Sequence, residues 1–436
     1  MSTIVLATFG SLGDLHPYLA IGIGLKLRGH RVTLAGCESY RDKVLGEGLN
    51  FHRLRPDFAT VAASPEAIER AFDPRTGSQF YVREIVLPYL EQTHEDLLAA
   101  CLGADLLLIQ PTLFTAPIVA EKLKLKWLSV VLAPGSFFSA LDPPLLPPLP
   151  WLHALRPLGP LPQRWMFQAM KIMTKHWTRG VDEIRKREGV RYRSRCALFD
   201  DMFSPFGTLA CYSPVFGAAQ PDWPKPSLIT GFPFYEHGSV GNSIPPELDA
   251  FLSAGEPPVI FTLGSSAVGA AGDFFDVSLA AATRTGCRAA FLTGPQAQDR
   301  ANASDDQFFF TSYAPYSKLF PRARAVVHQG GIGTVACALR AGVPSLIVPR
   351  GLDQPDNAKR VQRLGAVRVL PRHRYTAARA SAELRALLDS AHCRENAQRL
   401  GERVRSEDGV AAACDAIEHV CAGKPLELFV PRGLPV

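Results

Sequence analysis

The sequence predicts an α/β protein with two domains, each a parallel sheet covered by helices on both faces. Its 436 residues are too many for one hydrophobic core and suit two domains of roughly 200 residues. Short apolar runs alternate with helical patterns, which is typical of parallel sheets with helices on both faces. A glycine cluster at residues 330–333 connects an apolar strand to a helix, as at the sheet edge where open parallel sheets bind ligands.

The first half of the chain is expected to begin with a β-α-β unit. A strand at Thr3–Thr8 leads into the turn FGSLGDLHP. Pro17 fits the first turn of a helix that runs to about Arg28, because its missing N–H is not needed there. Further strands are expected at Arg31–Gly36, Ala104–Ile109, Trp127–Leu132 and Thr208–Cys211, and helices at Gln79–Cys101 and Thr115–Lys124.

The second half repeats this alternation after a Pro-rich passage from Pro214 to Pro226. Short apolar runs predict buried strands at Pro258–Leu263, Ala325–Val327 and Ser345–Val348. Helical patterns are found at Thr334–Arg340, Ala377–Leu388, Cys393–Arg405 and Gly409–Cys421.

Charge and cysteine usage exclude several classes of protein. The net charge of +6 is modest over this length, and no Lys/Arg run approaches the basic arm of a nucleic-acid-binding protein. The nine cysteines are scattered, without a Cys-x-x-Cys pair or a His at metal-ligand spacing, so we expect reduced core residues of a cytoplasmic protein. The N-terminus reads as a strand rather than a signal peptide, and no apolar run reaches about 18 residues, so neither secretion nor a membrane span is expected.

The stretch from His328 to Asn357 contains the chemistry-bearing pattern. Bare N–H groups at a helix N-terminus, together with the helix dipole, form an anion site, and glycines let a phosphate approach the backbone. His328 can add a side-chain donor to the same anion. Asp353 and Gln354 follow the next strand, and an acid beside an amide suits sugar hydroxyls. Taken singly, the glycine turn fits ordinary topology, and a lone His fits a local structural role.

The ordered combination is more specific. His-x-Gly-Gly-x-Gly-Thr, then Ala-Gly-Val-Pro, then Asp-Gln-x-x-Asn-Ala resembles the donor-binding signature of GT-B glycosyltransferases, which use nucleotide-activated sugars. The pattern is similar to the bacterial branch related to sterol and macrolide glucosyltransferases and to UDP-glucuronosyltransferases. The resemblance implies two Rossmann-like, doubly wound domains facing across a cleft. It also implies that His328, Gly331, Ile332, Gly333 and Thr334 hold the donor diphosphate.

The resemblance gives domain limits. An acceptor-binding domain is expected at residues 1–215, a linker at 216–245, a nucleotide-sugar domain at 246–408, and at 409–436 a helix and tail that pack back on the first domain. The phrase Thr230-Gly231-Phe232-Pro233 resembles the point at which the family crosses between domains.

Other donor contacts follow from the same resemblance. Ser265 and Ser266, after a predicted strand, are expected to face the donor phosphates, although a plain serine turn would look the same. Tyr313 and Ala314 resemble the element whose aromatic ring stacks on uracil while the backbone reads its edge. Tyr316 replaces an amide of that element, and the Glu that holds the ribose hydroxyls falls on Cys337, which weakens the case for uridine over thymidine.

The turn after the first strand is expected to activate the acceptor. The resemblance gives Asp14 the role of general base, and His16 is the rival base because imidazole titrates near neutral pH. An Asp that only caps the following helix is the alternative. Gly10 and Gly13 look like half of a dinucleotide fingerprint, but the third glycine and the acidic residue are not convincing, so NAD binding is not expected.

The segment LDPPLLPPLPWLHALRPLGPLP, within residues 134–162, is too rich in Pro for regular structure and too apolar for a solvated linker. A helix is expected from about Arg164 to Arg187, with the large apolar residues Trp165, Phe167, Met170, Met173 and Trp177. Each of these alone fits core packing. Together they suit an apolar acceptor pocket or a peripheral membrane contact.

The sequence as a whole predicts an inverting glycosyltransferase. It would move a hexose from a UDP-sugar, with UDP-glucose first, to a hydroxyl of a lipophilic or aromatic small molecule, without a metal or other cofactor. A nucleotide-sugar epimerase on the same fold would need no acceptor pocket, and a non-catalytic sugar-nucleotide sensor would not need Asp14.

Overall fold

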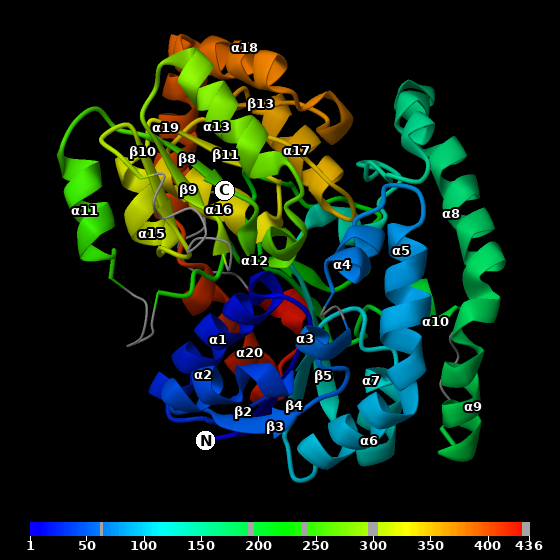
Figure 1. Ribbon diagram of the computed structural model, residues 1–436. Coiled ribbons are helices and arrows are strands. Elements are labelled where there is room, and N and C mark those ends of the chain that lie inside the picture. The colour runs from blue at the N-terminus through cyan, green and yellow to red at the C-terminus, as the bar shows by residue number, and fades with distance from the viewer. Residues whose placement is uncertain (62–63, 191–195, 237–242, 295–303, 430–436) are drawn as a thin grey trace. The chain divides into compact units, whose positions relative to one another are not determined.

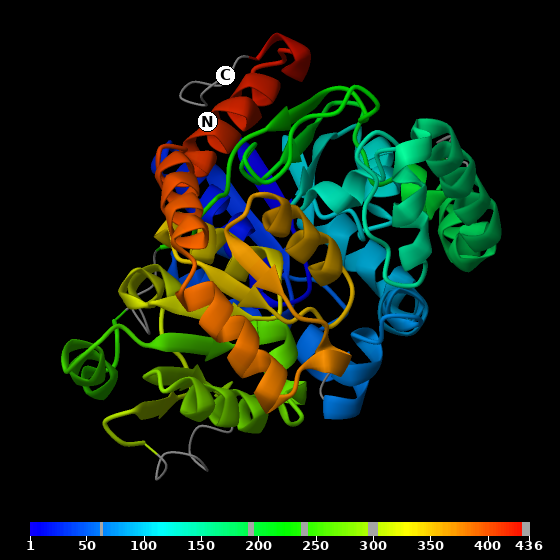
Figure 2. The ribbon, with the colours of Figure 1, turned by 90° about the horizontal axis from the view of Figure 1, so that it is seen from above.

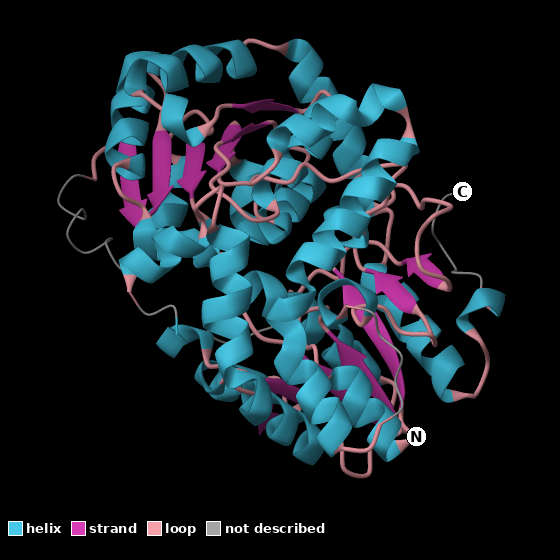
Figure 3. Cartoon of the chain, turned by 90° about the vertical axis from the view of Figure 1, so that its right-hand side faces the viewer, coloured by secondary structure: helices cyan, strands magenta, loops and turns pink. Residues whose placement is uncertain are grey.

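The computed structural model describes residues 1–61, 64–190, 196–236, 243–294 and 304–429 (Figure 1). The chain divides into two compact units. The N-terminal unit comprises residues 1–63, 75–235 and 407–436, and the C-terminal unit comprises residues 64–74 and 236–406. Each unit has its own parallel sheet flanked by helices (Figure 3). The predicted fold class of two parallel α/β domains is therefore confirmed.

The sheet of the N-terminal unit has seven parallel strands in the order β3-β2-β1-β4-β5-β6-β7. They are β1 (Thr3–Ala7), β2 (Arg31–Gly36), β3 (Asn50–Arg53), β4 (Leu106–Ile109), β5 (Lys126–Val131), β6 (Thr208–Ala210) and β7 (Ser227–Ile229). Alternate residues of β1 enter different cores, Ile4 and Leu6 on one face and Val5 and Ala7 on the other. Burial on both faces explains why these strands read as continuous apolar runs.

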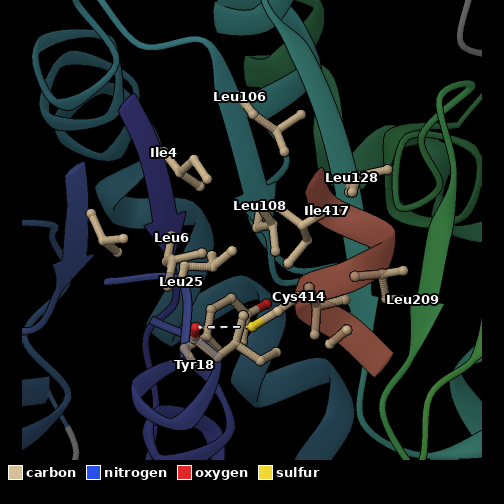
Figure 4. Packing of buried hydrophobic residues seen from close by; sticks show 14 of the residues in the cluster. Ile4, Leu6, Tyr18, Leu25, Leu106, Leu108, Leu128, Leu209, Cys414 and Ile417 are labelled. Carbon is tan, nitrogen blue, oxygen red and sulfur yellow. Dashed lines mark hydrogen bonds between the residues drawn. The ribbon is translucent and has the colours of Figure 1, made fainter. Parts of the chain in front are cut away.

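Helix α20 (Gly409–Cys421) packs against α1 (Leu12–Leu27) in the N-terminal unit, although nearly 400 residues separate them (Figures 1 and 2). Figure 4 shows Cys414 and Ile417 of α20 among the β-strand leucines and Tyr18. The contact is close, because a Cβ at Gly24 would lie 2.8 Å from Cys414 Sγ. Arg28, at the end of α1, pairs with Asp415 at 2.5 Å.

The remaining helices of the N-terminal unit surround its sheet. They include α2 (Arg41–Gly46), α5 (Gly77–Phe80), α6 (Leu90–Ala100), α7 (Ala116–Leu123), α8 (Pro160–Thr174), α9 (Arg179–Arg187) and α10 (Ala197–Asp200). Short 3₁₀ helices at Pro150–Leu158 and Lys175–Thr178 precede and follow α8.

The C-terminal unit has six parallel strands in the order β10-β9-β8-β11-β12-β13. They are β8 (Val259–Thr262), β9 (Ala289–Leu292), β10 (Phe308–Thr311), β11 (Ala325–His328), β12 (Ser345–Ile347) and β13 (Val367–Val369). Its helices include α4 (Pro65–Ala71), α11 (Pro246–Ser253), α12 (Gly264–Ala267), α13 (Phe274–Thr285), α15 (Tyr316–Leu319), α16 (Ile332–Ala341), α17 (Gln354–Arg363), α18 (Ala377–Leu388) and α19 (Ala391–Arg405).

Four expectations differ from the structure. The Pro-rich segment within residues 134–162, expected to lack regular structure, contains the 3₁₀ helix Pro150–Leu158 and the first residues of α8. Pro17 lies in the second turn of α1 rather than the first, because Ser11 caps the helix and starts it at Leu12. The helix expected at Gln79–Cys101 contains a π-helical turn at Tyr81–Val86 and a 3₁₀ turn at Leu87–Tyr89, where Pro88 lacks the N–H that an α-helix needs. The helix expected from Arg164 to Arg187 is divided by the 3₁₀ turn into α8 and α9.

Sequence reasoning gave no residue bounds for β3, β7, β9, β10 or β13, each only three or four residues long. It also left residues 64–74 in the first domain, whereas they pack with the C-terminal unit. A Cβ at Gly351 would lie 2.3 Å from the backbone oxygen of Phe72, so the two backbones are in direct contact. Only a long-range contact of this kind reveals where such a segment packs.

Candidate active site

The turn between β11 and α16 presents backbone N–H groups at the end of a buried strand. Gly330 has φ +91°, and a Cβ there would lie 2.9 Å from Ile347 Cγ2, so glycine is required. The first helical hydrogen bond runs from Val335 N–H to the Gly331 carbonyl at 3.0 Å. The N–H groups of the three preceding residues therefore have no partner within α16, and Gly333 is exposed. The turn has the form of an anion site.

His328 ends β11 and is 1% exposed. Its Nδ1 accepts the N–H of Gly330 at 3.1 Å, which assigns the ring proton to Nε2. Nε2 is buried and has no partner among the described residues. Burial lowers the pKa of His328 to about 3, so the ring is neutral near pH 7. It can donate one hydrogen bond through Nε2–H but brings no positive charge.

Asn357 joins this turn to the start of α17. Its Nδ2 donates to the Gly330 carbonyl at 3.0 Å and to Asp353 Oδ2 at 2.7 Å. Asp353 is exposed, so its carboxylate is held at the surface beside the glycine turn. Sequence reasoning included Asn357 in the motif but gave it no role. Its partners identify it as the residue that positions Asp353.

Gln354 lies next to Asp353 in sequence but differs in its surroundings. It is 1% exposed, and its Oε1 accepts the N–H of Arg350 at 3.0 Å. The carboxamide oxygen therefore helps to fold the β12–α17 loop. Gln354 can offer a sugar its amide N–H groups, whereas Asp353 presents a carboxylate oxygen at the surface.

The loop after β8 lies beside the glycine turn. Gly264 has φ +65°, and a Cβ there would lie 2.4 Å from Gln329 Nε2 and 3.4 Å from Thr334 Oγ1. The following Ser265 is exposed, and Ser266 is partly exposed. The structure thus brings both serines to the edge of the sheet where the N–H groups of α16 begin. Gln329, which sequence reasoning did not consider, packs over Gly264 between the two loops.

The aromatic element precedes α15. Tyr313 is 50% exposed, so one face of its ring is open to stacking, whereas Ala314 is fully buried. Tyr316 is partly buried and packs against the core, because its hydroxyl bonds Thr262 Oγ1 at 2.8 Å and its ring stacks on Phe320. Cys337 of α16 is partly exposed, and burial raises the pKa of its thiol to about 12. A neutral thiol is a poor hydrogen-bond partner for hydroxyls.

Arg350 is a further feature that the sequence pattern did not indicate. It is 5% exposed, and its Nε and Nη2 have no hydrogen-bond partner within the described chain. Burial is the main cause that lowers its pKa to about 10, and the nearby Arg372 adds to this. A buried, unpaired guanidinium is costly, and it stands three residues before Asp353.

Asp14 lies at the start of α1 in the N-terminal unit. Ser11 is the N-cap residue, and its N–H and hydroxyl both bond Asp14 Oδ2, at 2.9 and 3.1 Å. Asp14 is thus the third helical residue of a capping box whose N-cap is Ser11, and its Oδ1 lies outside both bonds. Burial raises the pKa of Asp14 to about 6 despite the bonds from Ser11 that lower it. A carboxylate with this pKa is a competent base near neutral pH.

His16 has different surroundings from Asp14. Its ring packs on Tyr235 with centroids 4.8 Å apart, and its Nε2 is buried without a partner among the described residues. Burial, and then the charge of Lys43, lower the pKa of His16 to about 3. A ring with that pKa accepts a proton poorly at neutral pH, so the environment favours Asp14 over His16 as base.

Within the described residues, no group of three or more His, Cys, Asp or Glu side chains is placed to hold a metal ion. None of the helices in those ranges has the length and apolar character needed to cross a bilayer. Activity without a metal stays a prediction.

Two protein-family descriptions match the chain. Residues 4–136 match the N-terminal domain of glycosyltransferase family 28, and residues 295–417 match the C-terminal domain of proteins like erythromycin biosynthesis protein CIII. O-mycaminosyltylonolide 6-deoxyallosyltransferase of Streptomyces fradiae is 32% identical over 427 residues, which cover 95% of this chain and 97% of that protein. A sterol 3-beta-glucosyltransferase of Arabidopsis thaliana is 28% identical over 97% of this chain, which spans 66% of the plant protein.

Solved structures share the fold. The glycotransferase of kitacinnamycin superposes with a TM-score of 0.69 at 19% identity, covering 96% of this chain and 98% of that one. The glycosyltransferase VinC in complex with DTDP gives 0.68 at 18% identity, covering 97% and 100%. The resemblance drawn from the sequence motifs is confirmed: the chain belongs to the GT-B glycosyltransferases of the family 28 and erythromycin CIII-like type, related to macrolide and sterol glycosyltransferases.

Proposed function

We propose that the chain is an inverting glycosyltransferase that moves a hexose from a nucleoside diphosphate sugar to a hydroxyl of a lipophilic or aromatic small molecule. The observation that carries this proposal is the link made by Asn357, which holds the Asp353 carboxylate against the glycine turn of α16. One place thus combines free N–H groups for a diphosphate with an exposed acid for sugar hydroxyls.

The donor diphosphate binds at the N-terminus of α16 in this proposal. The N–H groups of Ile332, Gly333 and Thr334 and the helix dipole stabilise the negative charge that grows on the leaving diphosphate. The Nε2–H of His328 adds one neutral donor. Ser265 and Ser266 contribute hydroxyls from the neighbouring loop. Because backbone dipoles supply the positive potential, we propose that no divalent ion is needed.

Tyr313 stacks on the base of the nucleotide, with the backbone of Ala314 at the base edge. UDP-glucose is the donor that we propose first. The dTDP-sugars are the competing class of donor. The thiol of Cys337 is a poor hydrogen-bond partner for the ribose hydroxyls that distinguish uridine from thymidine. In addition, VinC and the spinosyn rhamnosyltransferase SpnG were solved with thymidine diphosphate. The sugar hydroxyls are bound by Asp353 and the amide N–H groups of Gln354.

Asp14 takes the proton of the acceptor hydroxyl while that oxygen attacks the anomeric carbon from the face opposite the diphosphate. The new carbon–oxygen bond forms as the bond to the diphosphate breaks, so an α-linked donor gives a β-linked product. A phenol or alcohol is a weak nucleophile until a base takes its proton. Oδ1 of Asp14 is the oxygen that Ser11 does not engage.

The named relatives define the acceptor panel. One is named for O-mycaminosyltylonolide and another for a sterol, so O-mycaminosyltylonolide, a sterol and a simple phenol represent the class. Each is incubated with UDP-glucose or dTDP-glucose, and hexose adducts are detected by mass spectrometry. Acceptor-dependent adducts support the proposal. Isomerised donor without any adduct would indicate an epimerase, and tight donor binding without turnover would indicate a sensor.

The sequence also predicts a peripheral membrane contact.

A further inference from the structure

Helix α8 (Pro160–Thr174) lies at the outer margin of the N-terminal unit, as Figures 1 and 2 both show. Only Gln163 and Phe167 of this helix are buried. They lie on the side of α8 that packs on its unit, where the ring of Phe167 meets that of Phe138 at 5.7 Å. Most of the helix surface therefore faces solvent.

The solvent side of α8 carries a stripe of large apolar side chains. Leu161, Trp165 and Ile172 are 63%, 76% and 76% exposed. At 100° per residue these three residues fall within about 40° on the helix surface, opposite Phe167. Trp151 and Leu158 in the preceding 3₁₀ helix are also more than half exposed. An apolar stripe of this length on a helix that is already packed on its other side marks a binding surface.

Positive charge flanks the stripe. No Asp or Glu occurs from Pro143 to Val181, whereas this stretch contains Arg156, Arg164, Lys171, Lys175 and Arg179. Lys171 pairs with Asp200 at 2.6 Å, and Arg156 with Asp142 at 3.4 Å. The other three have no carboxylate partner in the described part of the chain.

The positions of the charges match the geometry of an interfacial helix. Arg164 and Lys171 of α8, and Lys175 directly after its last residue, follow one another along a single flank, about 80° around the helix from the apolar stripe. Helices that lie in the plane of a membrane interface bury an apolar face at the acyl boundary and direct Lys and Arg to the headgroups. The side chains of Lys and Arg are long enough to reach headgroup phosphates from that depth.

We propose that α8 docks on the surface of an anionic lipid bilayer, with Leu161, Trp165 and Ile172 inserted and the basic flank on the headgroups. A second copy of the chain fits less well, because a symmetric contact would place the same uncompensated positive charges against each other. A nucleic acid would use the charges but would leave the apolar stripe exposed. This docking is independent of the transferase reaction and can be measured without it.

The test is sedimentation with vesicles of phosphatidylcholine alone or of phosphatidylcholine mixed with phosphatidylglycerol. The wild-type chain is expected to bind the anionic vesicles at least tenfold more strongly than the neutral ones, and about 0.5 M salt should remove most of that difference. The variant Leu161→Ser/Trp165→Ser/Ile172→Ser should lose at least tenfold in binding to anionic vesicles. Arg164→Glu/Lys175→Glu should lose the preference for anionic lipid.

Leu27→Ser/Leu102→Ser is the matched control, because these two leucines are 79% and 68% exposed on other elements. It should bind vesicles as the wild type does. All the changed side chains are exposed, so each variant should keep its circular dichroism spectrum and melting temperature. Wild-type binding that ignores lipid charge, or a triple serine variant that binds normally, would overturn the proposal. A wild-type dimer that the triple variant converts to a monomer would also overturn it, since the stripe would then bind a second copy.

Discussion

Replacing Asp14 with Asn tests the chemistry most sharply, because it removes basicity and keeps the local structure. The Asn carboxamide oxygen can still accept the Ser11 N–H that Asp14 Oδ2 accepts at 2.9 Å. The cap of α1 therefore persists, and we expect the free energy of unfolding to change by less than about 0.5 kcal/mol. A loss of activity in this variant then reports on proton transfer rather than on folding.

The size of the effect follows from the role of a base. With a pKa of about 6, Asp14 is mostly ionised at pH 7.5 and ready to accept a proton. Base catalysis by a positioned side chain is worth ~10²–10⁴-fold, or about 2.7–5.4 kcal/mol of barrier. The kcat of Asp14→Asn should fall by that factor with a phenolic acceptor, while the affinity for UDP measured by calorimetry stays nearly constant.

The pH profile gives an independent readout of the same residue. Because burial raises the pKa of Asp14 to about 6, wild-type kcat should fall about tenfold per pH unit below that value as the base becomes protonated. The Asn variant should show no such decline. His16, with a pKa of about 3, would give a profile that stays flat down to that pH. Near-normal turnover in Asp14→Asn together with a collapse in His16→Ala would refute the assignment.

Four further predictions concern the donor. His328→Ala should weaken UDP binding roughly ten- to a hundredfold, because a hydrogen bond to a charged phosphate contributes ~1.5–3 kcal/mol; calorimetry showing no change would exclude that contact. Asp353→Ala should leave UDP affinity intact and abolish the preference among UDP-sugars in competition assays, so equal damage to UDP and UDP-sugar affinity would contradict its role. Cys337→Glu should raise the kcat/KM ratio of UDP-glucose to dTDP-glucose, because a carboxylate accepts bonds from both ribose hydroxyls, and an unchanged ratio would remove Cys337 from the nucleotide site. Activity should persist in excess EDTA, and a complete loss that Mg²⁺ or Mn²⁺ restores would show that a metal is needed.

Local pattern was sufficient for most of the fold. Arg31–Gly36, Ala377–Leu388 and Gly409–Cys421 form over the residues expected for them, because a continuous apolar run or a helical period is a property of the segment itself. The segments that differ from the expected elements depend on a local proline or on contacts with distant parts of the chain. Pro88 breaks a helix that periodicity alone would continue, and the contact between Phe72 and Gly351 spans 279 residues of chain.

In the candidate site, too, local features could be predicted from the sequence, whereas contacts between distant segments could not. One short sequence motif contains the glycine turn, His328 and Asp353, so their proximity could be predicted. The structure places them together. The partners of Asn357 could not be predicted, since its bond to Gly330 joins the first turn of α17 to a turn 27 residues earlier in the chain. The burial of Arg350 and the packing of His16 on Tyr235 likewise depend on segments that meet only in the folded chain.

The sequence could not predict which face of α8 is exposed. The spacing of Trp165, Phe167 and Met173 is compatible with either a buried or an exposed helix face. The structure buries Phe167 and leaves Trp165 and Met173 more than 70% exposed. Which side of an apolar helix is covered depends on its neighbours, here Phe138 with the ring of Phe199 packed on it, rather than on its own period.

We propose that the chain performs an inverting transfer with Asp14 as base. The most direct measurement is the anomeric configuration of the purified product, determined by proton NMR after reaction of an α-linked nucleotide hexose with an accepted phenol or sterol. The account predicts a β-linked product from the wild-type chain. An α-linked product would contradict direct attack opposite the diphosphate and, with it, the role given to Asp14.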